Sequence, residues 1–485
     1  MKIKLLVTAL SIGLSVLSNP LLAKSNNVSA LVEKVVSSYG GDTLTTAKSI
    51  QITDHNKGPW PGESEHPGVP EIWRINEVLT IDFVNKRKSL LSWRVNRTSV
   101  DLDKFVFDGK QGRHYDILHN KYSNEDWIRY GSLGGSIVRT SDTMLAYMLN
   151  TAADTAEDKG EATYRGKPHH KLSFTAKTGH KFLLYVDAET GLINKMVRHH
   201  PSVGDLAYVF SNHKQNDGVT YSDDMNFFVG GEIRLISTER DLVLNPNVEH
   251  EFKPLPGFKH WGERIDTSEM QTKKIGQGVY QTGKGRALNI FIDNGEHFIA
   301  SGSARALMEN YAAMKSHAGV EKPIKYFVVT HHHRGTVAGL DSVVDTGIKL
   351  VTAERHLTEI EKRLDKKLAD DQVKLISDRK STKLGKVAIY DIASAHSEHN
   401  LVMYLPEHKA LYAEGHYESD LATAYPRVFK DMVLFYEHIQ NLGIDVSKYL
   451  DANSFRQFSA EEFATFAKEF TKHTCPTGYD ICQGG

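Results

Sequence analysis

The sequence predicts an α+β protein of two domains, an antiparallel β half-barrel followed by a mixed α/β domain. Three observations support this fold class. The chain has 485 residues, which is too many for one ordinary hydrophobic core. From about residue 48 to 258, short apolar runs alternate with turn residues, which is typical of antiparallel strands. After about residue 270, apolar runs alternate with segments of helical periodicity.

The composition is that of a globular protein, with 40% hydrophobic and 25% charged residues. Acidic and basic residues nearly balance, at a net charge of −1. We therefore expect no nucleic-acid partner and no binding to an anionic membrane, because both need a basic surface. The chain also has 24 histidines, an excess that fits metal chemistry or a pH-sensitive surface.

Residues 1–23 have the pattern of a secretory signal peptide. Lys2 and Lys4 precede an apolar run from Leu5 to Leu17, and a cleavage site is expected near Ala23. The alternative is a membrane anchor, which needs about 20 apolar residues, and polar residues interrupt this run too early. We expect a periplasmic or secreted protein without an integral membrane segment after cleavage.

The chain has two cysteines, Cys475 and Cys482, close to the C-terminus. In an oxidising compartment, cysteines at this spacing predict one disulfide bond that fixes the tail. A redox-active pair is the alternative, but such pairs usually have the spacing Cys-x-x-Cys.

A short helix is expected from about Ser29 to Tyr39, because Ser29 can cap it and Gly40-Gly41 can end it. A second helical segment is expected near Asp142 to Asn150. The rest of this region predicts strands that are separated by turn sequences. These strands are expected at residues 105–107, 172–174, 181–186, 192–193, 206–210, 225–229 and 233–236.

The rhythm of these strands resembles the periplasmic outer-membrane lipoprotein carrier and sorting fold. The resemblance covers about 200 residues and includes an Asp-x-x-Thr-Gly turn at 187–191, an Asn-Asp-Gly turn at 216–218 and a closing Glu-Phe-x-Pro at 251–254. It implies a domain at residues 24–258 whose curved sheet has an apolar concave face for a lipid or another apolar ligand. The alternative is a sheet that only packs on the second domain.

Proline, glycine and polar residues indicate a linker, which we place at residues 259–269. The second domain, residues 270–485, begins with a hairpin that turns at Asn294-Gly295. Its last helix begins at Ser459 with a capping box, Ser-x-x-Glu. Between these points we expect strands at 326–329, 348–353, 387–392, 401–405 and 410–413, and helices at 304–314 and 355–369.

The strand Tyr326–Val329 is the most informative, because three histidines follow it almost directly. In α/β folds, chemistry collects just past the carboxyl ends of such buried strands. Side chains alternate along an extended chain, so His331 and His333 can point one way while His332 points the other way. Two imidazoles at this spacing on one face are typical of the start of a zinc site.

A surface run of histidines is the alternative to a site. The apolar strand before the three histidines argues against it. Two other histidine pairs, His169-His170 and His199-His200, lack such a context, and we interpret them as surface features of the β domain.

The segment also resembles the metallo-β-lactamase superfamily, whose signature is an apolar strand, Thr-His-x-His-x-Asp-His and a glycine-rich turn. Thr330, His331, His333 and Gly339 match this signature. The resemblance covers about 200 residues and implies a four-layer αβ/βα sandwich, so the expected fold class is an antiparallel β half-barrel followed by a metallo-β-lactamase-like sandwich.

A second match to the family is Ala395-His396-Ser397, which a strand and Pro406 follow. His396 takes the place of the family's third histidine. The resemblance therefore implies one zinc ion on His331, His333 and His396, with a fourth position open for water.

The family's second metal site is not kept. Its Asp falls on Gly335 and its next His on Thr336, and the ligand positions near Gly415 and Asn453 are not matched either. Because every position of the first site is a histidine, we predict one zinc per chain. Four nearby residues are candidates to replace the missing base or ligand, with the first two chosen as catalytic candidates: Glu414, His416, His399 and His332.

These observations predict an exported, mononuclear zinc hydrolase that acts on an ester, amide or phosphoester of a small molecule or a lipid-like substrate. β-Lactams are not favoured, because the β domain is foreign to ordinary lactamases. The alternative function is a non-catalytic envelope protein that binds an apolar ligand or lipid and keeps the metallo-hydrolase domain as a scaffold. Metal storage or sensing is a third function, which only the histidine count suggests. The oligomeric state is left open.

Overall fold

The computed structural model describes residues 20–60, 62–201, 203–263, 265–417, 428–469 and 475–482. The chain divides into two compact units, one from residues up to 47 and 138–231, the other from 48–137 and 232–485. The domain boundaries predicted at 24–258, 259–269 and 270–485 stay predictions. The apolar core of the predicted signal peptide lies outside the described residues. No helix in the described ranges is long and apolar enough to cross a membrane.

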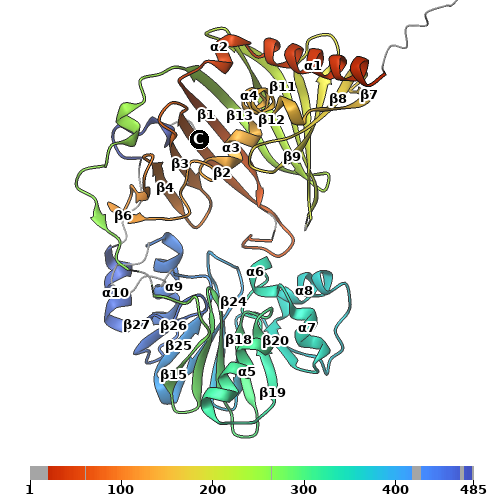
Figure 1. Cartoon of the computed structure of the whole chain (residues 1–485). Coiled ribbons are helices and arrows are strands. Elements are labelled where there is room, and N and C mark those ends of the chain that lie inside the picture. Colours follow the sequence, from red (N-terminus) through yellow and green to blue (C-terminus); the bar gives the residue numbers. More distant parts are fainter. Residues whose placement is uncertain are drawn as a thin grey trace, which may run out of the picture. The chain divides into compact units, whose positions relative to one another are not determined.

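The first unit contains helices and an antiparallel set of strands (Figure 1). Each strand from β7 to β11 pairs with the next one along the chain. Helix α1 begins at Pro20, before the predicted start at Ser29, but its buried stripe of Val32, Val35 and Val36 agrees with the prediction. The bounds are α1 (Pro20–Ser38), α2 (Asp42–Thr45), α4 (Asp142–Thr151), β7 (Glu157–Tyr164), β8 (Lys167–Thr175), β9 (Lys181–Asp187), β10 (Ile193–His200), β11 (Gly204–Asn216) and β12 (Val219–Val229).

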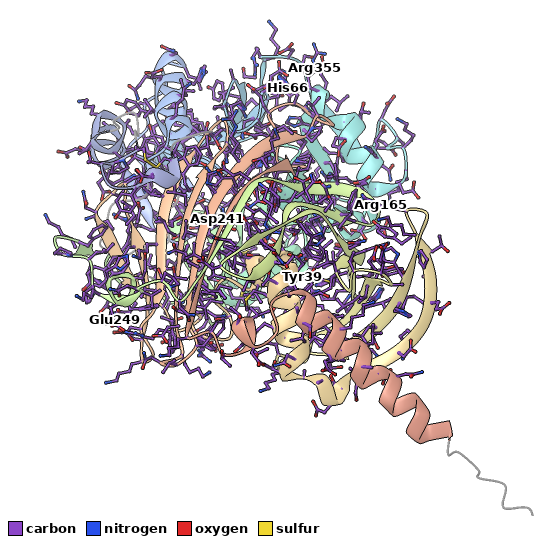
Figure 2. All side chains as sticks on the ribbon, turned by 90° about the horizontal axis from the view of Figure 1, so that it is seen from above. Tyr39, His66, Arg165, Asp241, Glu249 and Arg355 are labelled. Carbon is purple, nitrogen blue, oxygen red and sulfur yellow. A yellow bond between two sulfur atoms is a disulfide. The ribbon has the colours of Figure 1, made fainter. Side chains whose placement is uncertain are left out.

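A buried carboxylate joins the helices of this unit to its strands. Asp142, the first residue of α4, accepts hydrogen bonds from the Tyr39 hydroxyl (2.8 Å) and from the main-chain N–H and hydroxyl of Ser222 (3.1 and 2.9 Å). Its other close partner is His213 Nε2 at 3.0 Å. Tyr39, which directly follows α1 (Figure 2), also accepts from the main-chain N–H of Ile193. These bonds satisfy a charge that would be costly to bury alone.

The interpretation of His169 as a surface residue is wrong. His169 is only 1% exposed. Its Nδ1 lies 2.9 Å from the Lys167 carbonyl, which can only accept, so Nδ1 carries the proton and Nε2 accepts from the Asn194 amide at 3.1 Å. His199 is a surface residue as predicted, with 72% of its side chain exposed.

The second unit begins with a sheet in the order β14-β6-β5-β4-β3-β2-β1-β13. All of its strand pairs are antiparallel except one. The exception is β14, which belongs to the predicted linker and lies parallel to β6. Closure of the strands into a half-barrel stays a prediction. The bounds are β1 (Ser49–Trp60), β2 (Glu71–Asp82), β3 (Arg87–Val95), β4 (Val100–Phe107), β5 (Gly112–Asp116), β6 (Lys121–Asn124), β13 (Glu232–Leu244) and β14 (Lys259–His260), and α3 (Gly135–Thr140) lies at the boundary of the units.

Two further sheets of this unit pack face to face, in the orders β15-β16-β17-β18-β19-β20-β21 and β22-β23-β24-β25-β26-β27. Apolar side chains of both sheets fill the space between them, such as Ile290, Val328, Ile389 and Met403. The strand bounds are β15 (Gln271–Gly276), β16 (Val279–Lys284), β17 (Ala287–Asp293), β18 (Phe298–Gly302), β19 (Ile324–Val328), β20 (Lys349–Ala353), β21 (Val373–Ile376), β22 (Ser381–Leu384), β23 (Val387–Ile392), β24 (Asn400–Leu405), β25 (Ala410–Ala413), β26 (Lys448–Asp451) and β27 (Gln457–Ser459).

Helices cover the outer faces of both sheets (Figure 1). The core on one side includes Leu307 of α5 and Val343 of α7, and the core on the other includes Phe435 of α9 and Phe463 of α10. This arrangement has the four layers of the predicted αβ/βα sandwich. The helices are α5 (Leu307–Ala318), α6 (Arg334–Val337), α7 (Leu340–Asp345), α8 (Leu357–Leu364), α9 (Lys430–Asn441) and α10 (Ala460–Glu469).

Two local predictions are confirmed in this unit. The capping box is formed, because the Ser459 hydroxyl accepts from the Glu462 N–H (3.1 Å) and the Glu462 carboxylate accepts from the Ser459 N–H (2.8 Å). Cys475 and Cys482 form the predicted disulfide bond.

Candidate metal centre

The three consecutive histidines leave the sheet at the carboxyl end of β19. This strand lies parallel to β18 and β20 in the middle of its sheet, and its last residues, Phe327 and Val328, are buried in the apolar cores of opposite faces. After Val329, whose N–H still bonds to Val351, the chain turns away from the sheet. His331 and His333 are 2% and 4% exposed. The polar side chains are therefore held inside the protein at the edge where α/β folds place their sites.

The structure brings His331, His333 and His396 together. One ring nitrogen of each histidine lies within 4.8 Å of the others, and burial is nearly complete for two of the three. His331 Nε2 and His396 Nε2 face each other at 3.1 Å. The third ring, His333, lies with its centroid 4.6 Å from that of His331 and 4.3 Å from that of His396.

The proton of His331 is placed by a chain of two hydrogen bonds. The Thr330 hydroxyl donates to Glu414 Oε2 at 2.7 Å, so its oxygen accepts from His331 Nδ1 at 2.9 Å. His331 Nδ1 therefore carries the proton, and Nε2 presents a lone pair to the other histidines. A carboxylate that orients a ligating histidine in this way is a usual feature of metal sites.

His333 is oriented from a segment that is distant in the sequence. Its Nε2 lies 2.9 Å from the Ser64 carbonyl, which can only accept, so Nε2 carries the proton. Nδ1 is then the lone-pair nitrogen, and it is buried without a hydrogen bond. Glu63 Oε2 lies 3.4 Å from this nitrogen. A buried ring nitrogen that has no hydrogen-bond partner fits the role of a metal ligand.

His396 is held by its main chain and confined by a glycine. Its N–H donates to the Ser394 hydroxyl at 2.9 Å and to Asp431 Oδ1 at 3.1 Å. A Cβ atom on Gly415 would lie 2.3 Å from His396 Nε2, and Gly415 has a φ of +87°. Only glycine therefore leaves room for this imidazole.

The three imidazoles are neutral at pH 7. Burial, followed by the charges of neighbouring histidines, holds the pKa of His331 and of His396 well below the ordinary value. Burial lowers the pKa of His333 to about 4. Neutral imidazole is the form that binds zinc, so the donor set fits this metal.

The second metal position of the family holds a hydrogen-bonded network instead. Thr336 Oγ1 lies 3.2 Å from His331 Nε2 and donates to Glu414 Oε1 at 3.3 Å. The Glu414 carboxylate thus accepts hydrogen bonds from both Thr330 and Thr336. Burial raises the pKa of this carboxyl group. Beyond its own helix and chain neighbours, no heavy atom of the described residues lies within 4 Å of the place where a Cβ of Gly335 would stand. These positions supply hydroxyl groups and open space where the family has an Asp and a His.

His416, the other catalytic candidate, is buried beside the three histidines. Its ring stacks on Phe435 with centroids 4.3 Å apart, and its centroid lies 5.7 Å from that of His396. Neither ring nitrogen has a hydrogen bond among the described residues, and Nδ1 lies 3.5 Å from Asp431 Oδ2. The catalytic roles of Glu414 and His416 stay predictions.

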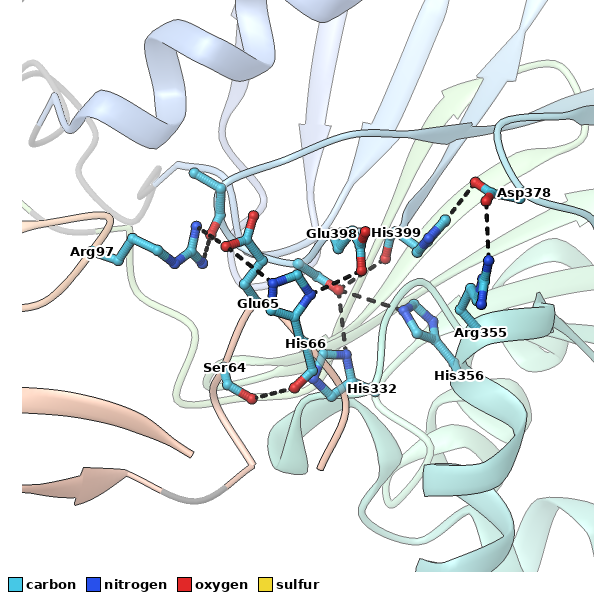
Figure 3. Close-up of polar contacts among 12 residues, drawn as sticks. Ser64, Glu65, His66, Arg97, His332, Arg355, His356, Asp378, Glu398 and His399 are labelled. Atoms are coloured by element: carbon cyan, nitrogen blue, oxygen red, sulfur yellow. Dashed lines mark hydrogen bonds and ion pairs between the residues drawn. The ribbon is translucent and has the colours of Figure 1, made fainter. Parts of the chain in front are cut away.

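His332 and His399, the remaining candidates, lie in a separate group (Figure 3). The Ser397 hydroxyl lies 3.3 Å from His332 Nδ1 and 3.5 Å from His356 Nε2, and it donates to the His399 carbonyl at 2.9 Å. His399 Nδ1 donates to Asp391 Oδ2 at 2.7 Å. This group ties the loop of His331 and His333 to the loop of His396, and it was not predicted from the sequence.

Asp378, Asp391 and His399 also have ligand atoms within 4.8 Å of one another. However, Arg355 lies 3.5 Å from Asp378, and Arg379 lies 3.8 Å from Asp391. These guanidinium groups already neutralise the carboxylates, so the group is an ion-pair network rather than a good cation site.

Two neighbouring cavities open onto the three histidines. One has a volume of about 310 Å³ and includes His331, Gly335 and Glu414 in its wall. The other has a volume of about 300 Å³ and extends to Trp73 of β2. Glu63, Arg286, His333, His396, Gly415 and Asn453 line both. A small molecule can therefore reach the centre.

Glu63 and Ser64 are the residues of this site that sequence reasoning missed. They lie between β1 and β2, in a stretch whose glycine and proline residues indicate only a turn. The Glu-Ser-Glu-His sequence of this stretch is the one sign of a functional site, and it does not identify the residues that these side chains contact. Burial raises the pKa of Glu63 to about 7, against the nearby charges of Arg363 and Arg334.

No family model and no curated protein matches this chain. Three solved structures that align with part of it are metallo-β-lactamases. The enzyme from Hirschia baltica is 17% identical over 41% of this chain and 96% of its own, with a TM-score of 0.34. FIM-1 from Pseudomonas aeruginosa, in its mono-zinc form, is 18% identical over 42% and 95%, with a TM-score of 0.33. The enzyme from Pontibacter korlensis is 16% identical over 42% and 100%, with a TM-score of 0.34. The structural neighbours are thus metallo-β-lactamases, but at these values their activity does not transfer to this chain.

Proposed function

We propose that this protein is a mononuclear zinc hydrolase whose ion is held by His331 Nε2, His333 Nδ1 and His396 Nε2. The convergence of these three ring nitrogens carries the proposal, and hydrogen bonds to Thr330 and Ser64 fix the protons of two of the rings on the opposite nitrogens. Two ligands on one tetrahedral zinc are separated by roughly 3.3 Å, given Zn–N distances of about 2.0–2.1 Å. The 3.1 Å between His331 and His396 is close to this value.

Zinc bound in this position supplies Lewis-acid chemistry, polarising an acyl or phosphoryl oxygen and acidifying water. The protein contributes the walls of the two cavities. Arg286 and Glu63, which line both, present a cation and an anion to a polar substrate. An ester, amide or phosphoester of a small molecule or a lipid-like compound fits this environment.

The protein is proposed to act in the periplasm or outside the cell. The signal-peptide pattern of residues 1–23 supports export. The disulfide bond between Cys475 and Cys482 supports an oxidising compartment.

The test is a metal analysis of the mature protein by mass spectrometry, together with hydrolysis of 4-nitrophenyl acetate and bis(4-nitrophenyl) phosphate. We expect about one zinc per chain, as three-histidine catalytic sites hold, and hydrolysis that a chelator removes and added zinc restores. His331→Ala should lose both the zinc and the activity. Wild-type protein that takes up no zinc during dialysis against zinc chloride would overturn the proposal.

A specific observation favours a second function, the binding of an anionic amphiphile by the first unit. A cavity of about 880 Å³ there has Leu183 and Val197 in its wall and Lys159, Lys171 and Lys181 around it. Across the strands, Leu183 faces Val197, and Ser173 faces Leu183, so these residues share one face of the sheet. Apolar side chains and lysines that line one cavity suit a fatty-acid-like ligand.

The fluorescent fatty acid cis-parinaric acid tests this second function. The double variant Lys171→Glu, Lys181→Glu is expected to weaken binding about tenfold, which corresponds to ~1.4 kcal/mol. Lys167→Glu, on the same strand as Lys171 but outside the cavity, is the control and should bind as the wild type does. Equal binding by all three proteins would exclude this cavity as the ligand site.

A further inference from the structure

The turn between β1 and β2 makes main-chain contacts with the loops that carry the candidate metal ligands. The Gly62 carbonyl accepts a hydrogen bond at 2.9 Å from the main-chain N–H of Arg334, the residue that follows His333. The Ser64 carbonyl accepts from the His333 ring. Hydrogen bonds of this kind fix the position of the turn relative to the loop of His331 and His333.

The same turn is bound to the loop of His396. The Glu65 carbonyl accepts from the Glu398 N–H at 2.9 Å, and His66 Nδ1 lies 2.9 Å from Glu398 Oε2 (Figure 3). Arg97, in the turn between β3 and β4, forms an ion pair with Glu65 at 3.2 Å and donates to the Ala395 carbonyl. Two turns of the N-terminal sheet thus support the candidate centre from one side.

Glu63 lies between these anchored residues and lines both cavities at the centre. Its Oε2 is 3.4 Å from His333 Nδ1, and its side chain is 32% exposed. Glu63 is not part of the group whose ligand atoms all lie within 4.8 Å of one another. The carboxylate is therefore beside the three histidines, on the side that faces the cavities, rather than among them.

The other acidic side chains in the cavity walls nearest the histidines are already engaged. Glu414 receives hydrogen bonds from Thr330 and Thr336. The Asp431 carboxylate accepts a hydrogen bond from the main-chain N–H of His396. Glu63 lies within ion-pair distance of His333 Nδ1, and the charges of Arg363 and Arg334 also act on it. No hydrogen bond to its carboxylate is found among the described residues, so the carboxylate can accept a proton from water.

We infer that Glu63 is the catalytic base of this centre and replaces the carboxylate that the family signature would place at Gly335. This inference rests on the proposed hydrolase function. In the step, an O–H bond of water breaks and its proton passes to the Glu63 carboxylate. The electron pair left on oxygen forms the new bond to the acyl carbon or phosphorus. The bond to the leaving group then breaks, and the leaving group takes the proton from Glu63, which restores the carboxylate.

The inference makes the site a joint product of the N-terminal sheet and the C-terminal sandwich. Gly335 lines the same cavity as Glu63, and the space beside it is open. The carboxylate would thus reach the cavity from the turn between β1 and β2 instead of from the loop after β19. The N-terminal sheet would then supply a catalytic residue to the site.

Glu63→Gln tests the inference, because the amide keeps the size of the side chain but cannot accept the proton. We expect kcat for 4-nitrophenyl acetate to fall on the order of 100-fold, within the usual contribution of a general base. The KM, the zinc content and the zinc affinity against a chelating dye should stay at wild-type values. In Glu63→Ala, added formate should restore part of the rate by supplying a carboxylate.

Glu321→Gln is the control, since this carboxylate is 84% exposed, forms an ion pair with Lys315 and lines neither cavity. It should keep the wild-type kcat. A Glu63→Gln protein with wild-type kcat would overturn the inference, and so would one that loses its zinc, because Glu63 would then be a ligand. Wild-type protein that binds no zinc would instead overturn the proposed function itself.

Discussion

Gly415→Ala is expected to weaken metal binding on the order of 100-fold while the chain stays folded. The new Cβ would stand 2.3 Å from His396 Nε2 and 2.7 and 2.8 Å from two ring carbons. Carbon atoms do not approach this closely, so the imidazole has to move. It cannot move toward His331, whose Nε2 already lies 3.1 Å away. His396 must leave its place, and one of the three candidate ligands is lost.

The positive φ of +87° at Gly415 adds strain to this substitution. A non-glycine residue in a left-handed conformation costs about 1–2 kcal/mol, which a protein of this size tolerates. We expect zinc affinity to fall on the order of 100-fold, at the upper end of the effect of residues that orient metal ligands. Competition with a chelating dye measures the affinity, and circular dichroism reports whether the fold is intact.

Gly335→Ala is the matched control for this prediction. Both glycines line the same cavity. A Cβ at Gly335 would meet no heavy atom within 4 Å among the described residues outside its own helix and chain neighbours, and the φ of Gly335 is not positive. The methyl group at Gly335 should leave zinc affinity within about twofold of wild type, since surface substitutions away from such features have effects within ±0.5 kcal/mol. Wild-type affinity in Gly415→Ala would show that His396 does not bind the metal through Nε2.

The part of the centre that could be predicted depends on local sequence. An apolar strand followed by His331 and His333 has a fixed side-chain alternation, so two imidazoles on one face follow from the sequence itself. The loss of the second metal position stays a prediction, which rests on Gly335 and Thr336 at the positions where the family signature has an Asp and a His. The capping box of Ser459 and Glu462 is local in the same sense.

The part that could not be predicted depends on contacts between distant residues. Ser64 and His333 are separated by 269 positions, and nothing in the turn that contains Glu63 indicates its partner. His169 was misjudged for the same reason, since its partner Asn194 belongs to another strand. Buried polar residues form hydrogen bonds with whichever residues the fold brings near them. The periodicity of the sequence predicts only the face of the helix or strand on which a residue lies.

A second expected result concerns stability: Glu77→Gln should stabilise the N-terminal sheet at pH 8 and have little effect at pH 5. Glu77 on β2 has Asp54 of β1 and Ser92 of β3 as its cross-strand neighbours. Arg240 of β13 lies 3.3 Å from Asp54, and Arg94 of β3 is engaged with Asp103 at 3.1 Å. Burial, followed by the charge of Asp54, raises the pKa of Glu77 to about 7.

The direction of the pH effect follows from this shift. The folded protein holds the Glu77 proton more tightly than the unfolded chain, so the ionised form disfavours folding. The penalty is absent below the ordinary pKa of 4.5, grows as the pH rises toward about 7, and is complete above it. At ~1.4 kcal/mol per pKa unit, the wild type loses up to about 3 kcal/mol over this window. Glutamine carries no charge at any pH and removes the loss.

Urea unfolding at pH 5 and pH 8, followed by tryptophan fluorescence, measures this difference. Trp73 and Trp93 lie on the strands β2 and β3 and report on this sheet. Glu232→Gln is the control, since this carboxylate lies on β13 with 73% of its side chain exposed. The control should follow the wild type at both pH values. If Glu77→Gln shifted the unfolding midpoint equally at pH 5 and pH 8, its effect would come from packing or hydrogen bonding, and Glu77 would not be the group that ionises in this window.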